Sequence, residues 1–321
     1  MKQKVNQSGF TLAEIAIVLA IIGIAMTMGL KMLTATLENS AYSETRAKQE
    51  RIKLALVSFM RSNGRLPCPD LKAALDGVEA AVCSVSPPVI PATLAANRAA
   101  GSGVIPWATL GLPREAVLDG WGNYFTYRVA NFVPVVDAVT AVGAVAGPPL
   151  HPFTNHNWTT AAGFDIRSLN TVPTAGSQTF LIQTRLTPAV ALSPESRNAV
   201  VVILSHGKNG LGARTTRPVA VAALPAAAVA PDERTTGTPG TITFVRRAVN
   251  DVAIDAANNP GGPTDDVVAY LTPQDLLHPL INEKTLLGQC YAYCLAANVP
   301  PPGPNCVPAA IPIGAVPLTC P

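Results

Sequence analysis

The residues that could carry out chemistry are few and lie far apart. Ser205 and His206 follow a β-branched run, where a hydrolase would place its nucleophile, but the flanking ILSHG lacks the Gly-x-Ser-x-Gly pattern. The turn GKNGLG lacks the order of a phosphate-binding loop, in which Lys precedes Ser or Thr. His151 and His156 have a spacing that does not place two imidazoles on one helix face. These patterns predict no enzyme active site.

The six cysteines fall into two groups along the chain. An even count fits up to three disulfides, and the sequence has no Cys-x-x-Cys pair of the kind that binds zinc. A bond between Cys68 and Cys83 would close a small loop and stabilise the protein by roughly 3 kcal/mol. The other four allow three pairings and would hold a proline-rich tail: Cys290, Cys294, Cys306 and Cys320.

The composition fits a neutral, loop-rich body. Only 13% of the residues are charged, about half the usual share for a globular protein. The 30 prolines and 24 glycines lie mostly in the second half and favour a β-rich body over a helical bundle. The net charge of +3 is small and no basic stripe alternates with aromatic residues, so no nucleic-acid partner is predicted.

The N-terminal region combines a polar segment, residues 1–9, with an apolar run from Phe10 to Leu30 that is long enough to cross a bilayer as a helix. No small-residue cleavage box follows the run, so the apolar segment is expected to stay in the mature protein. Lys2 and Lys4 favour a cytoplasmic N-terminus with the body outside, a bias that Lys31 weakens. The sequence predicts a single-pass protein in contact with membrane lipid.

Glu14 is the one ionisable residue in the apolar run, and a carboxylate at mid-bilayer costs about 3 kcal/mol. In one interpretation it closes a capping box with Thr11 at the helix start. In another, cleavage after Gly9 makes Phe10 the new amino terminus, and Glu14 neutralises the amino group of a neighbouring subunit. The two interpretations are compatible.

These residues resemble the processing motif of the type IV prepilin family, which has a short basic leader, a Gly at the cut, a Phe as first mature residue and a Glu at the fifth mature position. Gly9, Phe10 and Glu14 match in place. The resemblance implies that a prepilin peptidase cuts after Gly9 and methylates Phe10. It also implies that Glu14 serves assembly with other pilins or pseudopilins, from the inner membrane and its assembly platform into a periplasmic or extracellular filament.

A second resemblance lies in the body of the chain. The segment DGWGNYFTY is similar to the Asp-x-Trp-Gly-Asn-x-x-x-Tyr signature of the major pseudopilin of type II secretion; the matching residues are Asp119, Trp121, Gly122, Asn123 and Tyr127. SHGKNG stands where pseudopilins have Ser-x-Gly-x-Asp-Gly, and DDVV resembles their closing Asp-Ile strand. The resemblance favours a pseudopilin or a related minor pilin.

The pseudopilin loops bind calcium, so calcium is the one cofactor that the resemblance raises. Here Asn209 takes the acidic position of the loop, and Lys208 beside it would repel a cation. Asn209, Asp265 and Asp266 could still surround calcium together with backbone carbonyls. The sequence favours a metal-free loop, with a calcium site as the alternative, and predicts no other cofactor.

The predicted fold is α+β: a long N-terminal helix packed on an antiparallel sheet with large loop-rich insertions, as in pilins. No proline precedes Pro67, so the helix should be straighter than in relatives with a membrane proline, and Asn63-Gly64 should end it. Ile52, Leu56 and Phe59 recur at helical spacing, so one face is expected to pack on the body.

The predicted boundaries follow from these patterns. They are a leader at 1–9, a transmembrane part of the helix at 10–30, an extramembrane part at 31–63, and a globular domain at 64–321 with insertions near 130–178 and 213–264 and a Cys/Pro-rich tail. Residues 84–103 are predicted as loop and Leu276 to Ala297 as a short helix. Strands are predicted at Tyr124–Val129, Thr179–Leu186, Ala199–Leu204 and Ile242–Ala248, with a closing strand from Asp265.

The predicted function is that of a structural subunit of a type IV pilus or a type II secretion pseudopilus, a minor one because a bulky domain would crowd a helical array. The first alternative is an adhesin or substrate-binding pilin at the filament tip, against which the presence of Glu14 argues mildly. A membrane-anchored periplasmic enzyme is less favoured, because no acid–base constellation can be assembled.

Overall fold

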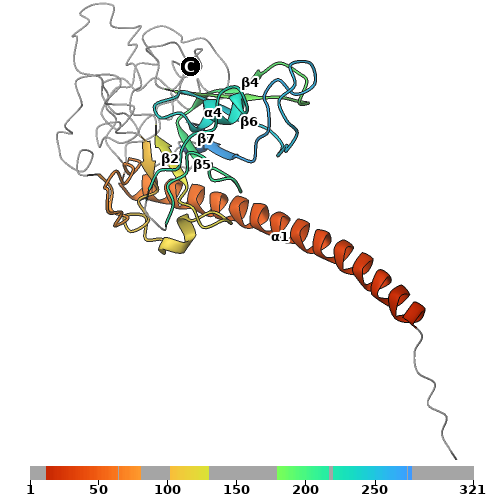
Figure 1. Cartoon of the computed structure of the whole chain (residues 1–321). Coiled ribbons are helices and arrows are strands. Elements are labelled where there is room, and N and C mark those ends of the chain that lie inside the picture. The colour runs from red at the N-terminus through yellow and green to blue at the C-terminus, as the bar shows by residue number, and fades with distance from the viewer. Residues whose placement is uncertain are drawn as a thin grey trace, which may run out of the picture.

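A computed structural model describes residues 12–63, 65–80, 102–129, 179–216, 220–272 and 274–276. The predicted insertion at 130–178, the C-terminal tail and nearly all of the helix predicted from Leu276 lie outside the described residues. What is described is a mixed α+β structure, as predicted, with one long N-terminal helix and a body of two small sheets beside its C-terminal half (Figure 1).

The long helix, α1, runs without interruption from Leu12 to Asn63 over 52 residues, or about 80 Å. The sequence contains no proline in this range, so every residue can keep its intrahelical hydrogen bond. The predicted end at Asn63 is confirmed. Figure 1 shows α1 curving gently along its length rather than kinking at one point.

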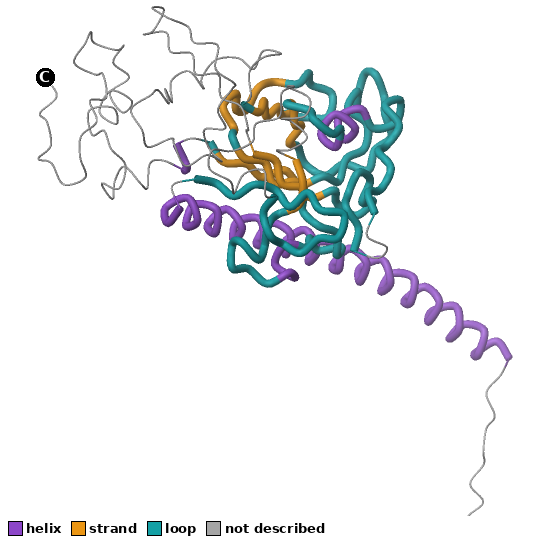
Figure 2. Tube along the Cα trace, turned by 90° about the vertical axis from the view of Figure 1, so that its left-hand side faces the viewer, coloured by secondary structure: helices purple, strands orange, loops and turns teal. Residues whose placement is uncertain are grey.

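One face of the C-terminal half of α1 is buried against the body. Its fully buried side chains recur every three or four residues, and they are Thr45, Gln49, Ile52, Leu56 and Met60. The predicted packing of Ile52 and Leu56 is therefore confirmed, whereas Phe59 beside them is only half-buried. Figure 2 shows the strands gathered on one side of this half of the helix.

The first sheet has four antiparallel strands in the order β1-β2-β5-β7. They are β1 (Ser102–Val104), β2 (Thr126–Val129), β5 (Val201–Ser205) and β7 (Val267–Leu271). All five residues of β5 are buried, since this β-branched strand has a neighbour on each edge. Tyr127 stands opposite Ile203, which stands opposite Ala269 on the other side.

The second sheet has the order β4-β3-β6 and is not purely antiparallel. Its strands are β3 (Phe180–Thr184), β4 (Ser193–Ala199) and β6 (Thr243–Arg246). β3 pairs antiparallel with β4 but parallel with β6. The expectation of one antiparallel sheet is thus wrong in this part, because a parallel pair needs a long crossover, which local alternation does not reveal.

The stretch 213–264, predicted to be an insertion that decorates the first sheet, builds much of the second sheet's side of the molecule. It contains β6 and a short helix, α4 (Pro231–Gly237), which begins with a proline in its first turn. Asp232 of α4 accepts hydrogen bonds from Arg185 at the end of β3, at 2.8 and 3.1 Å. The stretch therefore has secondary structure of its own, which an ion pair joins to the end of β3.

The predicted strands are present with altered bounds, and three segments differ from expectation. Ala199 belongs to β4 and not to the strand predicted at 199–204. β1 begins inside the stretch 84–103 that was predicted as loop, and its Val104 exchanges two backbone hydrogen bonds with Asp70. A 3-10 helix, η1 (Arg114–Val117), precedes β2 and was not predicted.

A buried amide fixes α1 to the centre of the first sheet. The side-chain nitrogen of Gln49 donates to the backbone oxygens of Ile203 in β5, at 3.1 Å, and of Val267 in β7, at 2.8 Å. Gln49 is 2% exposed, and these two hydrogen bonds satisfy its buried amide nitrogen.

Replacing Gln49 with Leu should lower the free energy of unfolding by about 1–3 kcal/mol, because two buried carbonyls lose their donor while the volume is nearly kept. Urea unfolding of the full chain in detergent measures it. Glu50→Leu is the matched control, since the neighbouring Glu50 is exposed and should change stability by less than about 0.5 kcal/mol. Equal effects of the two substitutions would contradict the anchoring role of Gln49.

Candidate functional site

The residues predicted for processing and assembly lie at the start of the chain. Gly9 and Phe10 are outside the described residues. Glu14 is an exposed residue in the first turn of α1, third in a helix that begins at Leu12. This is the position expected for a capping-box glutamate, although its predicted partner Thr11 is again outside the described part.

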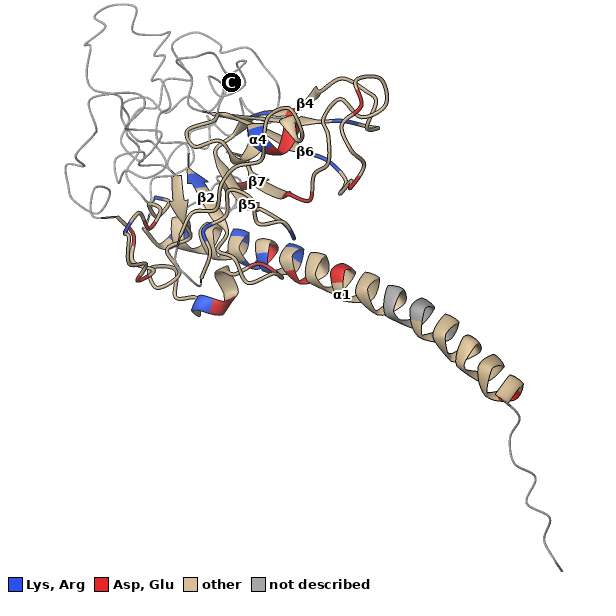
Figure 3. Cartoon of the chain, viewed as in Figure 1, with Lys and Arg blue, Asp and Glu red and all other residues tan. Residues whose placement is uncertain are grey.

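The N-terminal half of α1 exposes large apolar side chains all around its axis. They include Leu12, Ile15, Ile17, Val18, Leu19, Ile21, Ile22, Ile24, Met32, Leu33 and Leu37. In Figure 3 the charged residues of α1, coloured blue and red, are concentrated in the part of the helix beside the body. A helix that is apolar on every face is stabilised by apolar surroundings, and no described residue of the body covers this half of α1.

Within the described residues, no helix is found that is long and apolar enough to cross a membrane. The segment predicted to do so, residues 10–30, includes residues 10 and 11 and the side chains of 25 and 27–30, which are not described. The transmembrane assignment stays a prediction.

The segment DGWGN forms a loop that lies directly on α1. The backbone nitrogen of Gly120 donates to the hydroxyl of Thr45 at 2.9 Å, and Trp121 meets the ring of Tyr42 edge-on with centroids 4.7 Å apart. A Cβ at Gly120 would overlap the backbone of Ala41, so only glycine permits this approach. The carboxylate of Asp119 shapes the turn, accepting from the backbone nitrogens of residues 121 and 123.

The hydrolase residues set aside from the sequence have structural roles. Ser205 is fully buried and donates to Asp119 at 2.8 Å. His206 is 2% exposed and lies 3.0 Å from the hydroxyl of Thr126, and burial lowers its pKa to about 4. A neutral, buried imidazole and a buried hydroxyl do not form a nucleophile site. His151 and His156 lie outside the described residues.

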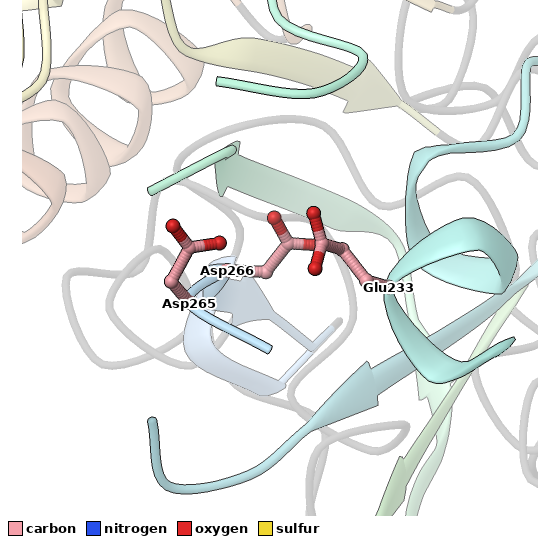
Figure 4. Close-up of side chains that lie close together, drawn as sticks. All are labelled: Glu233, Asp265 and Asp266. Carbon is pink, nitrogen blue, oxygen red and sulfur yellow. The ribbon is translucent and has the colours of Figure 1, made fainter. Parts of the chain in front are cut away.

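A cluster of three buried carboxylates lies between α4 and the segment that leads into β7. Glu233, Asp265 and Asp266 each offer an oxygen atom, and these atoms all lie within 4.8 Å of one another. Figure 4 shows Glu233 coming from α4 and the two aspartates from the chain before β7. Their exposed fractions are 2%, 7% and 5%. We call these residues the carboxylate cluster.

The carboxylate cluster has little positive charge close to it: Arg247 lowers the pKa of Glu233, but burial raises it more strongly. In the described part of the molecule, no Lys, Arg or His forms an ion pair with its members, and three oxygens accept no hydrogen bond: Oδ1 of Asp265 and both oxygens of Asp266. Burial, together with the charge of Asp265, raises the pKa of the Glu233 carboxyl to about 7. Burial, together with the charges of Glu233 and Asp265, raises the pKa of the Asp266 carboxyl well above its usual range. Burial also raises the pKa of Asp265. Such a site favours protons or a bound cation.

The predicted ligand set of Asn209, Asp265 and Asp266 stays a prediction, and the structure places Glu233 beside the two aspartates. The side-chain nitrogen of Asn209 donates to Glu233 at 2.6 Å, and its backbone nitrogen donates to Asp265 at 2.7 Å. Its side-chain oxygen accepts from the backbone nitrogen of Leu211, so Asn209 holds the carboxylates in place through its two nitrogens. Lys208, expected to repel a cation, forms an ion pair with Glu38 of α1.

Sequence reasoning missed Glu233. In the sequence, PDER predicts at most a helix start with acidic residues in its first turn, and nothing local connects position 233 with 265. Only the crossover that places α4 beside the start of β7 brings these side chains together.

A groove of about 730 Å³ borders the cluster at Asp266. Gln49 of α1 and residues 267–270 of β7 also line it, together with four basic residues: Arg46, Lys53, Arg246 and Arg247. Glu233 and Asp265 are not among the lining residues.

Cys68 is fully buried and disulfide-bonded. The other five cysteines, Cys83, Cys290, Cys294, Cys306 and Cys320, lie outside the described residues. The pairing of Cys68 with Cys83 therefore stays a prediction.

The decisive comparison concerns the first thirty residues. Residues 4–30 match the family model described as the prokaryotic N-terminal methylation motif. This is the signal motif of type IV pilins and pseudopilins. The search of curated proteins and the search of solved structures found no match.

The methylation motif supports a type IV pilin-like or pseudopilin protein. It implies processing by a prepilin peptidase, assembly with other pilins, and a membrane-anchored or filament-associated location. Proteins with the methylation motif are typically structural rather than enzymatic. The motif covers the beginning of α1 and does not extend to the body or to the carboxylate cluster.

Gly207 makes the approach of the cluster to the turn at 206–210 possible. Its φ is +58°, and an added Cβ would overlap the backbone oxygen of Asp265. Gly111 has a similar φ of +67° but open space around it.

Gly111→Ala should cost about 1–2 kcal/mol for the left-handed backbone alone. Gly207→Ala should cost about 1–3 kcal/mol more, because it also displaces Asp265. Urea unfolding of both variants measures the two losses of unfolding free energy. Equal losses would show that close contact between Gly207 and Asp265 does not constrain the turn.

Proposed function

We propose that this chain is a minor structural subunit of a type IV pilus or a type II secretion pseudopilus, cleaved after Gly9 and N-methylated at Phe10. The methylation motif carries the proposal. The apolar side chains exposed around the first half of α1 support it, because a filament built of packed helices would bury them.

Before assembly, the same apolar half of α1 would anchor the subunit in the inner membrane, with the body in the periplasm. In the filament, Glu14 would neutralise the amino terminus of a neighbouring Phe10. An unpaired carboxylate buried among apolar helices is strongly disfavoured, so this pair would reject a subunit placed out of register.

Glu14→Ala should leave cleavage and methylation intact, since neither uses this carboxylate as a reactive group, and should reduce incorporation into filaments by at least about tenfold. Mass spectrometry of the N-terminus gives the processing state, with methylated Phe10 expected as the first residue. Immunoblotting of sheared filament fractions against membranes gives the incorporation.

Glu44→Ala is the matched control. It also removes a carboxylate from α1, but Glu44 is exposed and forms an ion pair with Lys48 one turn away, outside the apolar half. Filament recovery of Glu14→Ala equal to that of Glu44→Ala would reject the pairing, and a retained leader in functional wild-type protein would reject the processing.

We also propose that Asp265 and Asp266 bind a calcium ion. Three of their oxygens are buried without a partner, and carboxylate oxygen is the ligand type that calcium prefers. Bound calcium would balance charges that the protein leaves unpaired.

Asp266→Asn should weaken calcium binding by at least about a hundredfold, because it removes a ligand charge whose two oxygens have no other partner. Isothermal titration of the full chain with calcium chloride, after treatment with a chelator, measures the affinity. Unchanged affinity in the variant, or none in the wild type, would exclude this site.

A further inference from the structure

Asp232 and Glu233 are adjacent carboxylates of α4 whose surroundings differ in charge. Asp232 points to the second sheet, where it is paired with Arg185 at 2.8 Å and with Arg247 at 3.5 Å. Glu233 points to the start of β7 in the first sheet and has only the neutral Asn209 as hydrogen-bond partner, among the residues described. Asp232, on the side of the second sheet, therefore has cationic partners, whereas Glu233, on the side of the first sheet, forms no ion pair among the residues described.

The helix is otherwise well fixed to the second sheet. The hydroxyl of Thr236 accepts from the backbone nitrogen of Val245 in β6 at 3.0 Å. At the end of α4, Arg128 of β2 donates to the backbone oxygen of Thr238 at 2.9 Å and lies over the ring of Phe244. A contact from the first sheet thus holds the C-terminal end of α4, while its N-terminal end faces the two unpaired aspartates.

We infer that Glu233 is a third ligand of the cation held by Asp265 and Asp266, and that the cation joins α4 and the second sheet to the first sheet. This inference rests on the calcium site proposed above and adds to it a ligand from a distant stretch of the chain. The three ligand oxygens lie within 4.8 Å of one another, a separation that lets all three contact one ion at about 2.3–2.6 Å.

The burial of Glu233 supports the same assignment. The residue is 2% exposed and reaches a place where two other carboxylates already lie, an arrangement that repels itself unless a positive charge is added. Asn209 places Glu233 and Asp265 by donating one hydrogen bond to each, whereas both side-chain oxygens of Asp266 accept none. A bound divalent cation would complete the site.

A cation that joins α4 to the start of β7 should change how these two segments open locally. With the cation bound, the first turn of α4 and the start of β7 would open together; without it, α4 would open with the second sheet alone. In hydrogen–deuterium exchange on the wild-type full chain, calcium should slow the backbone exchange of residues 232–236 and 265–267 by at least about tenfold. This measurement needs no variant.

Glu233→Gln is the test of the third ligand, with Glu115→Gln as matched control because Glu115 is an exposed carboxylate of η1 far along the chain. Glu233→Gln should weaken calcium affinity by at least about tenfold, and at matched calcium occupancy exchange in residues 232–236 should no longer slow. Glu115→Gln should behave as wild type.

The outcomes separate the two proposals. If wild type and Glu233→Gln bind calcium with equal affinity, or calcium slows exchange at 265–267 but not at 232–236 in the wild type, the calcium site stands and the link through Glu233 is overturned. If the wild type binds no calcium, both fail. The subunit assignment is tested separately through Glu14.

Discussion

The structure depends on a helix that has to be stable in two different surroundings. From Thr45 onward, α1 buries one face against the first sheet and leaves the other polar, as an ordinary surface helix does. Between Leu12 and Leu37 the described large apolar side chains are exposed. The described part of the body therefore covers only the C-terminal half of the helix. The filament-subunit proposal follows from this imbalance together with the methylation motif.

Contact between body and helix is polar as well as apolar. Gln49 bonds to two strands, Thr45 to the DGWGN loop, and Lys208 to Glu38 on the exposed part of the helix. Hydrogen bonds at fixed positions set the register of α1 against the sheet, which apolar packing alone leaves loosely defined. A fixed register would keep the body in one position relative to Glu14, as a helical filament requires.

The carboxylate cluster lies at the start of β7 in the same sheet, at the junction with α4. Among the other buried charges of the described body, Arg65 is paired with Glu79 and Arg185 with Asp232, and Asp119 accepts several hydrogen bonds from neutral groups. Asp265, Asp266 and Glu233 bring three carboxylates into one small volume, and both side-chain oxygens of Asp266 have no hydrogen-bond partner. Concentrated unpaired charge of this kind is a feature of functional sites more often than of packing.

The sequence by itself determined the features that depend on neighbours along the chain. The apolar run with Glu14, the uninterrupted helix to Asn63 and the approximate positions of most strands follow from local periodicity and short motifs, because helices and single strands are local structures. Asp265 and Asp266 were also identified as candidate ligands from the sequence. Tertiary structure alone decided the parallel pairing of β3 with β6, the close contact of Gly120 with Ala41, and the position of Glu233 beside Asp265 and Asp266. These contacts join residues far apart in the chain, and no local pattern encodes which crossover will bring them together.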